Sequence, residues 1–290
     1  MSLVAVRLHD DDFIRVQAMM LEYAGITLAI SKKQMAENRL SRALRSSEFN
    51  DFSSYLSNVS KNGVLKQGFI NAMTTNVTSF YREPHHFKVL SLTFDQTFGK
   101  TRVTPLVWSA GCSTGEEAIS ILFTVLDALD DSAINTVLAK AKPFILATDV
   151  DTAVLNQAQI ARFTAAQVVA IPPRWLARAF EYSADQHYLL RSEFKQLIKF
   201  QALNLNSPLW NFPPGFSHAA FDAIFCRNVM IYFNAQTQRT LLKKFTHVMH
   251  ERSLLFSGHS EMLLHSNDLF ESLGGTAYKL NAKDQRGQGL

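Results

Sequence analysis

Apolar positions in the first 73 residues are spaced as in amphipathic helices. Acidic residues 10–12 are typical of a helix start, apolar side chains then recur at helical intervals over 13–21, and Gly25 ends the pattern. Ser31 is expected to cap the next helix, whose apolar face consists of Ala36, Leu40, Ala43 and Leu44. The pattern predicts an all-α N-terminal domain over residues 1–73.

Strands alternate with helices beyond about residue 103. The segments expected to form strands are 105–109, 143–151, 253–261 and the first part of 221–233, and the helices include 116–129 and 237–249. Such alternation is typical of a parallel sheet with right-handed crossovers. The sequence therefore predicts an α/β fold, with a Rossmann-like domain over residues 103–290.

Two further segments complete this organisation. Residues 74–102 are expected to form a linker followed by a linker helix that begins near Pro84. Residues 160–202 interrupt the alternation, and within them HYLLR (187–191) and LIKFQALN (197–204) are expected to pair as antiparallel strands. We therefore predict a small antiparallel β-subdomain inserted into the Rossmann-like domain.

The composition indicates a cytoplasmic protein. Of 290 residues 47% are hydrophobic and only two are cysteine, and no apolar run reaches the roughly 18 residues that span a bilayer. The N-terminal sequence lacks the basic and apolar regions of a secretory signal. We expect neither membrane insertion nor a disulfide framework.

Basic residues concentrate on one predicted helix. The net charge is +4, and residues 30–45 contain five basic residues against a single acidic one, Glu37. Such a patch is either a solvated face or a docking surface for an acidic partner. The five basic residues are Lys32, Lys33, Arg39, Arg42 and Arg45.

The loop after the first strand reads AGCSTG (110–115) and is followed by Glu116 and Glu117 at a helix start. Ligands of open parallel sheets bind beyond the carboxyl ends of the strands. The loop matches neither phosphate-binding fingerprint, and two carboxylates would repel a pyrophosphate but attract a cation. S-adenosylmethionine, which carries an ammonium and a sulfonium, fits this pattern. Acidic residues are also favoured in a first helical turn by the helix dipole alone.

Asp149 ends the second strand, where Rossmann-type sheets place an acid on ribose hydroxyls. Asp151 competes as a helix cap, and a nicotinamide cofactor would use the same acid. No metal-binding or nucleophile motif is present in the sequence. His85 and His86 are expected at the surface, and Cys226 in the core.

Several separated motifs stand in order over residues 13–261. They are AGITLAISKKQMAENRLSRALR, TTNVTSFYRE, VWSAGCSTGEE, ATDVD, Asn204-Leu205, FDAIFCRNVMIYF and SGHSE. Together they resemble the chemotaxis receptor methyltransferases, the CheR family. The resemblance implies a methyltransferase domain with a β-subdomain insert, joined by a linker to a helical domain. It also implies transfer of a methyl group from S-adenosylmethionine to receptor glutamates, which forms methyl esters.

The resemblance also implies roles for residues around the donor. The linker would cover the donor with Asn76, Thr78 and Arg82, and Tyr232 would stand beside the transferred methyl group, opposite Arg82. The other implied contacts are Glu117 at the ammonium end with the Ala110–Gly111 backbone nearby, Asp149 at the ribose, Asn204 and Leu205 beside the adenine, and Arg227 and Asn228 where the pocket closes.

Two segments depart from the family pattern. Ala118-Ile119 stand where the family usually has Pro-Tyr. Members that grip the C-terminal pentapeptide of a receptor carry a longer, glycine-containing stretch in the β-subdomain, whereas residues 181–193 contain no glycine here. We therefore expect the enzyme to act on receptor helices without this tether. Separately, we expect it to be a monomer.

The implied chemistry needs no general base. A glutamate side chain with a pKa near 4.3 is already an ionised nucleophile at neutral pH. The basic helix would meet glutamate-rich receptor helices by charge complementarity, and no nucleic-acid partner is expected. Three alternatives stay open: a sensor that binds S-adenosylmethionine without turnover, a Rossmann dehydrogenase, and a methyltransferase for another acceptor.

Overall fold

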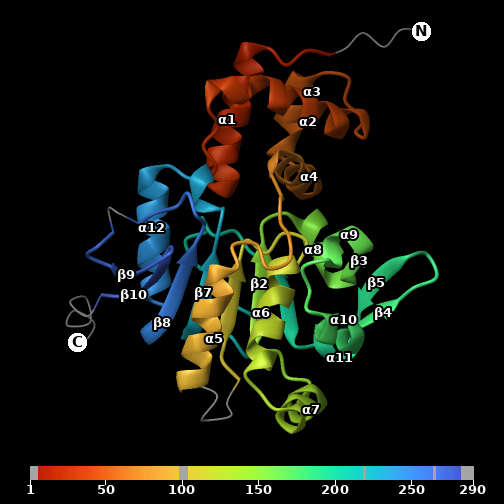
Figure 1. Ribbon diagram of the computed structural model, residues 1–290. Coiled ribbons are helices and arrows are strands. Elements are labelled where there is room, and N and C mark those ends of the chain that lie inside the picture. The colour runs from red at the N-terminus through yellow and green to blue at the C-terminus, as the bar shows by residue number, and fades with distance from the viewer. Residues whose placement is uncertain (1–5, 98–103, 218–219, 264–265, 282–290) are drawn as a thin grey trace.

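The computed structural model describes residues 6–97, 104–217, 220–263 and 266–281. Its first part contains only helices, as predicted (Figure 1). These are α1 (Asp10–Ala24), the 3-10 helix η1 (Ile30–Lys32), α2 (Lys33–Arg45), α3 (Phe52–Val59) and α4 (Gly63–Met73). They enclose a hydrophobic core of their own, which includes Val16, Leu40 and Phe69.

Local residues explain some of the ends of these helices. Gly25 ends α1 with a φ of 73°, a left-handed conformation that glycine adopts without a steric penalty. Asp51 accepts a hydrogen bond of 2.8 Å from the Ser54 N–H at the start of α3, and Asn62 accepts one of 2.9 Å from Val64 at the start of α4. The expected cap at Ser31 is wrong, because Ser31 lies inside η1 and α2 begins without a side-chain cap.

A seven-stranded sheet forms the centre of the second part. Its strands are β1 (Val107–Ala110), β2 (Ile145–Asp149), β6 (Ile198–Ala202), β7 (Phe221–Cys226), β8 (Met249–Ser257), β9 (Phe270–Gly274) and β10 (Ala277–Leu280). Their order is β6-β2-β1-β7-β8-β10-β9, in which the first five are parallel and the last two are antiparallel additions. From β1 the chain builds one half of the sheet and then the other, so a topological switch point lies at the carboxyl end of β1. The predicted α/β fold is confirmed.

Helices cover both faces of this sheet (Figure 1). They are α5 (His85–Thr97), α6 (Glu116–Asp127), α7 (Asp131–Lys140), α8 (Thr152–Ile160) and α12 (Ala235–Thr246), with the short η2 (Met230–Tyr232) after β7. One core joins α5 and α6 to the sheet and includes the buried Ala118 and Ile119. The other core lies against α12 and is centred on Trp108, which contacts four aromatic rings.

The inserted subdomain is smaller than predicted. It contains α9 (Ala165–Val168), α10 (Pro173–Ala179), α11 (Ser192–Lys195) and the antiparallel sheet of β3 (Arg162–Thr164), β5 (His187–Leu190) and β4 (Phe180–Tyr182). The expected pairing of 187–191 with 197–204 is wrong, because β6 instead pairs in parallel with β2. Residues 198–202 therefore belong to the main sheet, where they place Asn204 at its carboxyl edge.

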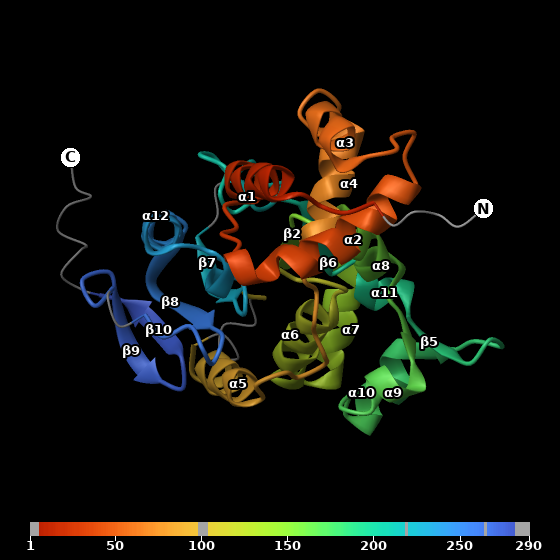
Figure 2. The same ribbon diagram turned by 90° about the horizontal axis from the view of Figure 1, so that it is seen from above.

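The helical part lies over the carboxyl ends of the strands, as the view from above shows (Figure 2). The loop after α1 makes backbone contacts with the segment after β7, since Thr27 N–H donates to the Tyr232 carbonyl at 2.8 Å and Ile26 forms a β-bridge with Phe233. The Asn204 side-chain amide donates to the Tyr23 carbonyl at 2.6 Å. Among the described residues, no helix is long and apolar enough to cross a membrane.

Candidate functional site

A pocket of about 610 Å³ opens where the helical part meets the strand ends. This size suits a small organic ligand. The pocket brings together almost every predicted catalytic and cofactor-binding residue: Asn76, Thr78, Arg82, Gly111, Glu117, Asp149, Asn204, Leu205, Arg227, Asn228 and Tyr232. Ala110 is the exception, because its side chain is buried at the end of β1 outside the pocket lining.

The glycine loop needs small residues at the pocket floor. Gly111 has a φ of 103°, and a Cβ atom there would stand 2.4 Å from the Val229 Cγ2 atom. Four other residues in the loops around the pocket adopt left-handed backbone conformations, which are uncommon outside glycine: Tyr81, Glu83, Ser113 and Asn228. Such backbone strain concentrates where a structure holds a functional geometry.

Only one of the two acids at the start of α6 faces the pocket. The Glu117 carboxylate accepts a hydrogen bond of 2.6 Å from the Ser109 hydroxyl and lies 3.5 Å from the Arg227 guanidinium. Burial raises its pKa, while Arg227 and Ser109 oppose that rise. Glu116 instead accepts hydrogen bonds from Thr114 at 2.6 Å and Gln167 at 3.3 Å, outside the pocket lining. The argument from two pocket carboxylates is therefore wrong for Glu116.

Asp149 and Asp151 have different roles: one lines the pocket and the other caps a helix. Asp151 caps α8, since its carboxylate accepts a hydrogen bond of 2.8 Å from the Ala153 N–H. Asp149 lines the pocket, and its carboxylate accepts hydrogen bonds from the Ser113 and Asp151 N–H groups at 2.9 and 3.0 Å. Burial raises the pKa of Asp149, and these backbone donors oppose the rise.

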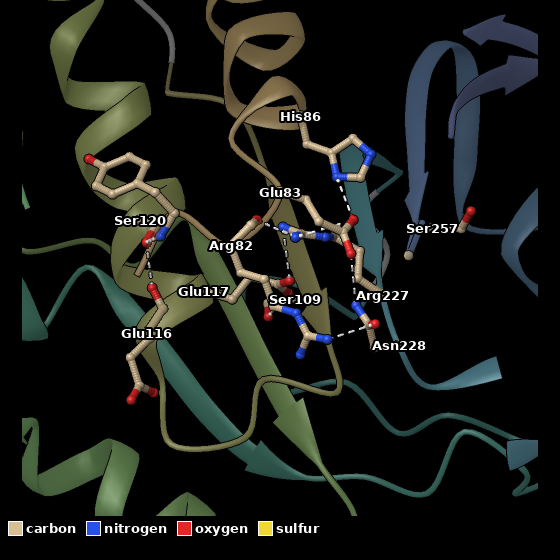
Figure 3. Close-up of polar contacts among 12 residues, drawn as sticks. Arg82, Glu83, His86, Ser109, Glu116, Glu117, Ser120, Arg227, Asn228 and Ser257 are labelled. Atoms are coloured by element: carbon tan, nitrogen blue, oxygen red, sulfur yellow. Dashed lines mark hydrogen bonds and ion pairs between the residues drawn. The ribbon is translucent and has the colours of Figure 1, made fainter. Parts of the chain in front are cut away.

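Arg82 and Arg227 stand side by side in the close-up view (Figure 3). Arg82 donates to the Val77 carbonyl at 2.6 Å and to the Asn228 side-chain oxygen at 2.9 Å. Arg227 is 2% exposed in its side chain and lies 3.5 Å from both Glu83 and Glu117. A buried cation between two carboxylates neutralises charges that would otherwise be costly to desolvate. We call Glu83, Glu117 and Arg227 the buried network.

His86 extends this network and corrects a prediction. It is fully buried rather than at the surface, and its Nε2 lies 2.8 Å from the Gly275 carbonyl while its Nδ1 lies 3.5 Å from the Glu83 carboxylate. Burial, reinforced by the charge of Arg227, lowers the pKa of His86 to about 4. His85 is partly exposed, and with Glu83 and His86 it forms a group of possible metal ligands. Arg227 already neutralises the charge of Glu83, so the charges at this position favour the ion pair with Arg227 over a bound metal ion.

The segment carrying Tyr232 is fixed by a buried carboxylate. Glu261 accepts hydrogen bonds from the Asn228 N–H at 2.7 Å and the Ile231 N–H at 3.0 Å. Burial raises the pKa of Glu261, and these backbone donors oppose the rise. The sequence placed Glu261 in a motif without a role, and its hydrogen bonds now show that it holds the backbone on both sides of Val229.

Family models match nearly the whole described chain. The model for the SAM-binding domain of CheR methyltransferases matches residues 76–279, and the model for their all-alpha domain matches residues 11–74. This chain belongs to the CheR methyltransferase family. It is therefore a methyltransferase enzyme that uses S-adenosylmethionine.

Similar CheR proteins are found in several bacteria. The chain is 38% identical to the chemotaxis protein methyltransferases of Salmonella typhimurium and Escherichia coli, over 94% of this chain and 91% and 92% of those proteins. It is 35% identical to chemotaxis protein methyltransferase 2 of Pseudomonas aeruginosa, over 92% of each chain.

The pocket fits S-adenosylmethionine, the methyl donor of the CheR family. Glu117 and Asp149 supply carboxylates on its floor, one suited to an ammonium group and one to hydroxyl groups. Apolar side chains from Leu203, Leu205 and Phe233 line other parts of the pocket, as an adenine ring requires. The left-handed glycine at 111 allows the backbone to approach a ligand closely.

The structure separates the five predicted docking residues. Lys32 and Arg39 line the pocket, and Arg39 donates its hydrogen bonds to the linker rather than to solvent. Lys33 pairs with Asp10 at 2.5 Å. Arg42 and Arg45 are exposed, and neither makes an ion pair with another described residue.

Sequence reasoning missed the contribution of the loop between α1 and α2. Residues 26–29 line the pocket together with Met35 of α2. The loop lies inside the motif AGITLAIS, so the signal was present, but nothing local indicated that the helical part would reach the donor pocket.

Proposed function

We propose that this enzyme transfers the methyl group of S-adenosylmethionine to glutamate side chains of chemotaxis receptors, forming glutamyl methyl esters. The observation that carries the proposal is the pocket at the strand ends, which combines Glu117 and Asp149 with Arg82 and Tyr232 in a CheR-family chain. The basic helix α2 contributes to its lining, and the exposed Arg42 and Arg45 of this helix suit an acidic acceptor.

The proposed donor contacts follow the pocket lining. Glu117 would hold the ammonium group, Asp149 the ribose hydroxyls, and Asn204 and Leu205 the adenine. The linker residues Asn76 and Thr78 would cover the donor, near the Ala110–Gly111 backbone, and Arg227 and Asn228 would close the pocket. The Asn76 side chain already donates to Asp151 at 2.7 Å, so we propose that Asn76 acts through its backbone.

Catalysis in this site rests on positioning. The bound donor supplies an electrophilic methyl group, and the acceptor carboxylate is ionised at neutral pH without a base. Arg82, held by Val77 and Asn228, would orient the reactants, and Tyr232 would orient the acceptor from the other side. We expect a rate without an essential group that titrates between about pH 6 and 8. A steep bell-shaped profile in that range would contradict this mechanism.

We propose that Lys32, Arg42 and Arg45 meet the acidic face of a receptor helix, and we call these three residues the docking stripe. Lys33, paired with Asp10, would contribute less. The partner is thus the cytoplasmic helical part of a receptor, and the enzyme would act in the cytoplasm as a monomer.

We further propose that the enzyme does not need a receptor's C-terminal pentapeptide. The β4–β5 turn of the subdomain spans only residues 183–186, and an ion pair joins Asp185 of this turn to Arg162 of β3. Calorimetric titration with the pentapeptide should show no binding at micromolar concentrations, and micromolar affinity would refute this part of the proposal.

The proposed division of the chain is a helical domain over 1–73, a linker with its helix over 74–102 and a methyltransferase domain over 103–290. The boundary between 102 and 103, together with both ends of the chain, lies outside the described residues.

Mass spectrometry of a receptor after incubation with isotopically labelled donor tests the function directly. We expect labelled methyl esters on glutamate residues of the receptor's cytoplasmic helices. Label on another residue type, or on nucleic acid, would identify a different acceptor. Binding of the donor without any transfer would indicate a sensor instead of an enzyme of this specificity.

A further inference from the structure

Arg39 projects from the basic helix α2, yet its guanidinium is directed at the linker. Its Nη1 donates to the carbonyls of Met73 and Thr74 at 2.8 and 2.9 Å, and its Nη2 donates to the Thr75 hydroxyl at 2.9 Å. Arg39 is half-buried, whereas Arg42 on the next turn is exposed. The two arginines therefore have different environments on one helix.

The carbonyls that Arg39 binds lie at the end of α4. Met73 is the last residue of α4 and Thr74 is its C-cap, so both carbonyls lie where a helix leaves acceptors without a partner inside the helix. A cation at this position also interacts favourably with the negative end of the helix dipole. Arg39 thus fixes the point at which the linker leaves α4.

From that point the linker leads directly to the donor pocket. The Thr74 hydroxyl and the Asn76 side-chain amide both donate to one oxygen of Asp151, at 2.6 and 2.7 Å. The Asp151 N–H in turn donates to the Asp149 carboxylate on the pocket floor at 3.0 Å. A short chain of hydrogen bonds therefore joins α2 to the residue proposed to hold the ribose.

Arg39 and Thr74 also form a wall between two cavities. On one side is the donor pocket, and on the other is a groove of about 740 Å³ between α2 and α4, which Arg42 also lines. Both residues line both cavities. A shift of the Arg39 side chain would change the shape of the donor pocket.

We infer that Arg39 is a positioning residue for the methyl donor and not a contact for the receptor. It holds the linker over the pocket through Met73, Thr74 and Thr75. The inference deepens the proposed function. Only its second part, that Arg39 does not contact the receptor, rests on that function. Its main test needs no receptor, so the two can fail separately.

The test measures the affinity for S-adenosylhomocysteine by calorimetry on the full chain without receptor. Arg39→Gln should weaken binding about tenfold, because hydrogen bonds from a charged donor are lost. Arg39→Lys should recover part of the loss, since an ammonium can bridge two carbonyls. Arg42→Gln is the matched control on the same helix and should bind the ligand with unchanged affinity.

In assays of receptor methylation, Arg42→Gln and not Arg39→Gln should weaken the interaction with the receptor, if the receptor is the acceptor. Arg42→Gln should raise KM for the receptor at low salt, and high salt should remove the difference. The loss of donor affinity in Arg39→Gln should persist at high salt, because its partners are carbonyl and hydroxyl groups. Normal ligand affinity of Arg39→Gln together with a salt-sensitive rise in KM would overturn the inference.

Thr75→Val provides a second variant in case Arg39→Gln does not fold. It removes one of the three acceptors of Arg39, the Thr75 hydroxyl, and leaves both carbonyls in place. Thr75 also lines the donor pocket, so Thr75→Ser, which keeps the hydroxyl, is the matched control. We expect donor affinity to fall about twofold to threefold. Unchanged affinity in both Thr75→Val and Arg39→Lys would also overturn the inference.

Discussion

The docking stripe and the buried network both contain arginine, but in opposite surroundings. Arg42 and Arg45 of the stripe are exposed to water, whereas Arg227 of the network is 2% exposed and lies between two carboxylates. Exposed charges act over a distance and are screened by salt. Desolvated charges act only in a fixed geometry, and each depends on its partner. If the proposed docking is right, this enzyme uses arginine both to bind its acceptor and to shape a pocket.

Removing Arg227 should have the largest effect. Arg227→Met would leave Glu83 and Glu117 buried without a cation, and we expect a loss of about 3 to 5 kcal/mol in the free energy of unfolding. Chemical denaturation at neutral pH measures this loss. Arg227→Lys keeps the charge and should lose less. Wild-type stability of Arg227→Met would show that the network does not depend on its cation.

The second largest effect should be a loss of folding stability at acidic pH, caused by the buried His86. The pKa of His86 is about 4 in the folded protein and about 6.5 in the unfolded chain, so the unfolded chain binds the extra proton first as the pH falls. Stability present above about pH 6.5 should therefore be lost toward pH 4, by about 2 to 3 kcal/mol at pH 4.5.

The measurement compares wild type with His86→Gln in denaturation experiments at pH 7.5 and pH 4.5. The variant lacks the titrating ring, so its stability should fall less on acidification. His85→Gln, which removes the partly exposed neighbour, should keep most of the wild-type pH dependence, because burial is the main cause of the lowered His86 pKa. Equal pH dependence in wild type and His86→Gln would mean that burial does not perturb this side chain.

Glu261 should have a smaller effect, mainly on turnover. Glu261→Gln replaces an acceptor oxygen with a donor amide beside the Asn228 or Ile231 N–H, and the segment carrying Tyr232 should lose its position. We expect kcat to fall about tenfold, equivalent to about 1.4 kcal/mol, with less change in KM for the receptor. Glu251→Gln removes an exposed carboxylate and serves as the control. A rise in KM alone would assign Glu261 to substrate binding instead.

The docking stripe should give the smallest effects and the strongest dependence on salt. Arg45→Gln should raise KM for the receptor about twofold to fivefold at low ionic strength, because an exposed charge contributes about 0.5 to 1 kcal/mol. At about 0.5 M salt the variant and wild type should converge. An effect of Arg45→Gln that is independent of salt would erase the distinction between stripe and network.

The sequence predicted those features that depend on neighbouring residues. Helical spacing identified the N-terminal helices, and the change to short apolar runs identified β1, β2, β7 and β8. Because parallel strands bring their carboxyl ends to one edge, motifs far apart in the chain could be expected in one pocket. The resemblance added the identities of linker residues such as Thr78, which no pattern would have selected.

The wrong predictions share a physical cause: the local sequence pattern does not show which distant residues a segment will contact in the fold. Residues 198–202 follow β5 closely, and local pairing was expected, but β6 instead completes the main sheet beside β2. His86 lies in a polar segment, and it is buried because Phe256 and the turn at Gly275 pack against it. Arg39 shares a helix with exposed arginines, and only the fold brings the linker carbonyls within its reach.

The β-bridge between Ile26 and Phe233 bears on whether the helical part can be exchanged between members of the family. This bridge and the hydrogen bond from Thr27 to Tyr232 join backbone atoms, so they place no demand on the side chains at those positions. The surface that faces a substrate can therefore diverge while the junction with the catalytic part is preserved. Chimeras that carry the helical part of another member should keep the pocket, provided that the segment equivalent to residues 25–29 retains its length. The side chains of Gln67 and Asn71, which donate to Val150 and Thr152 across the junction, must also be kept.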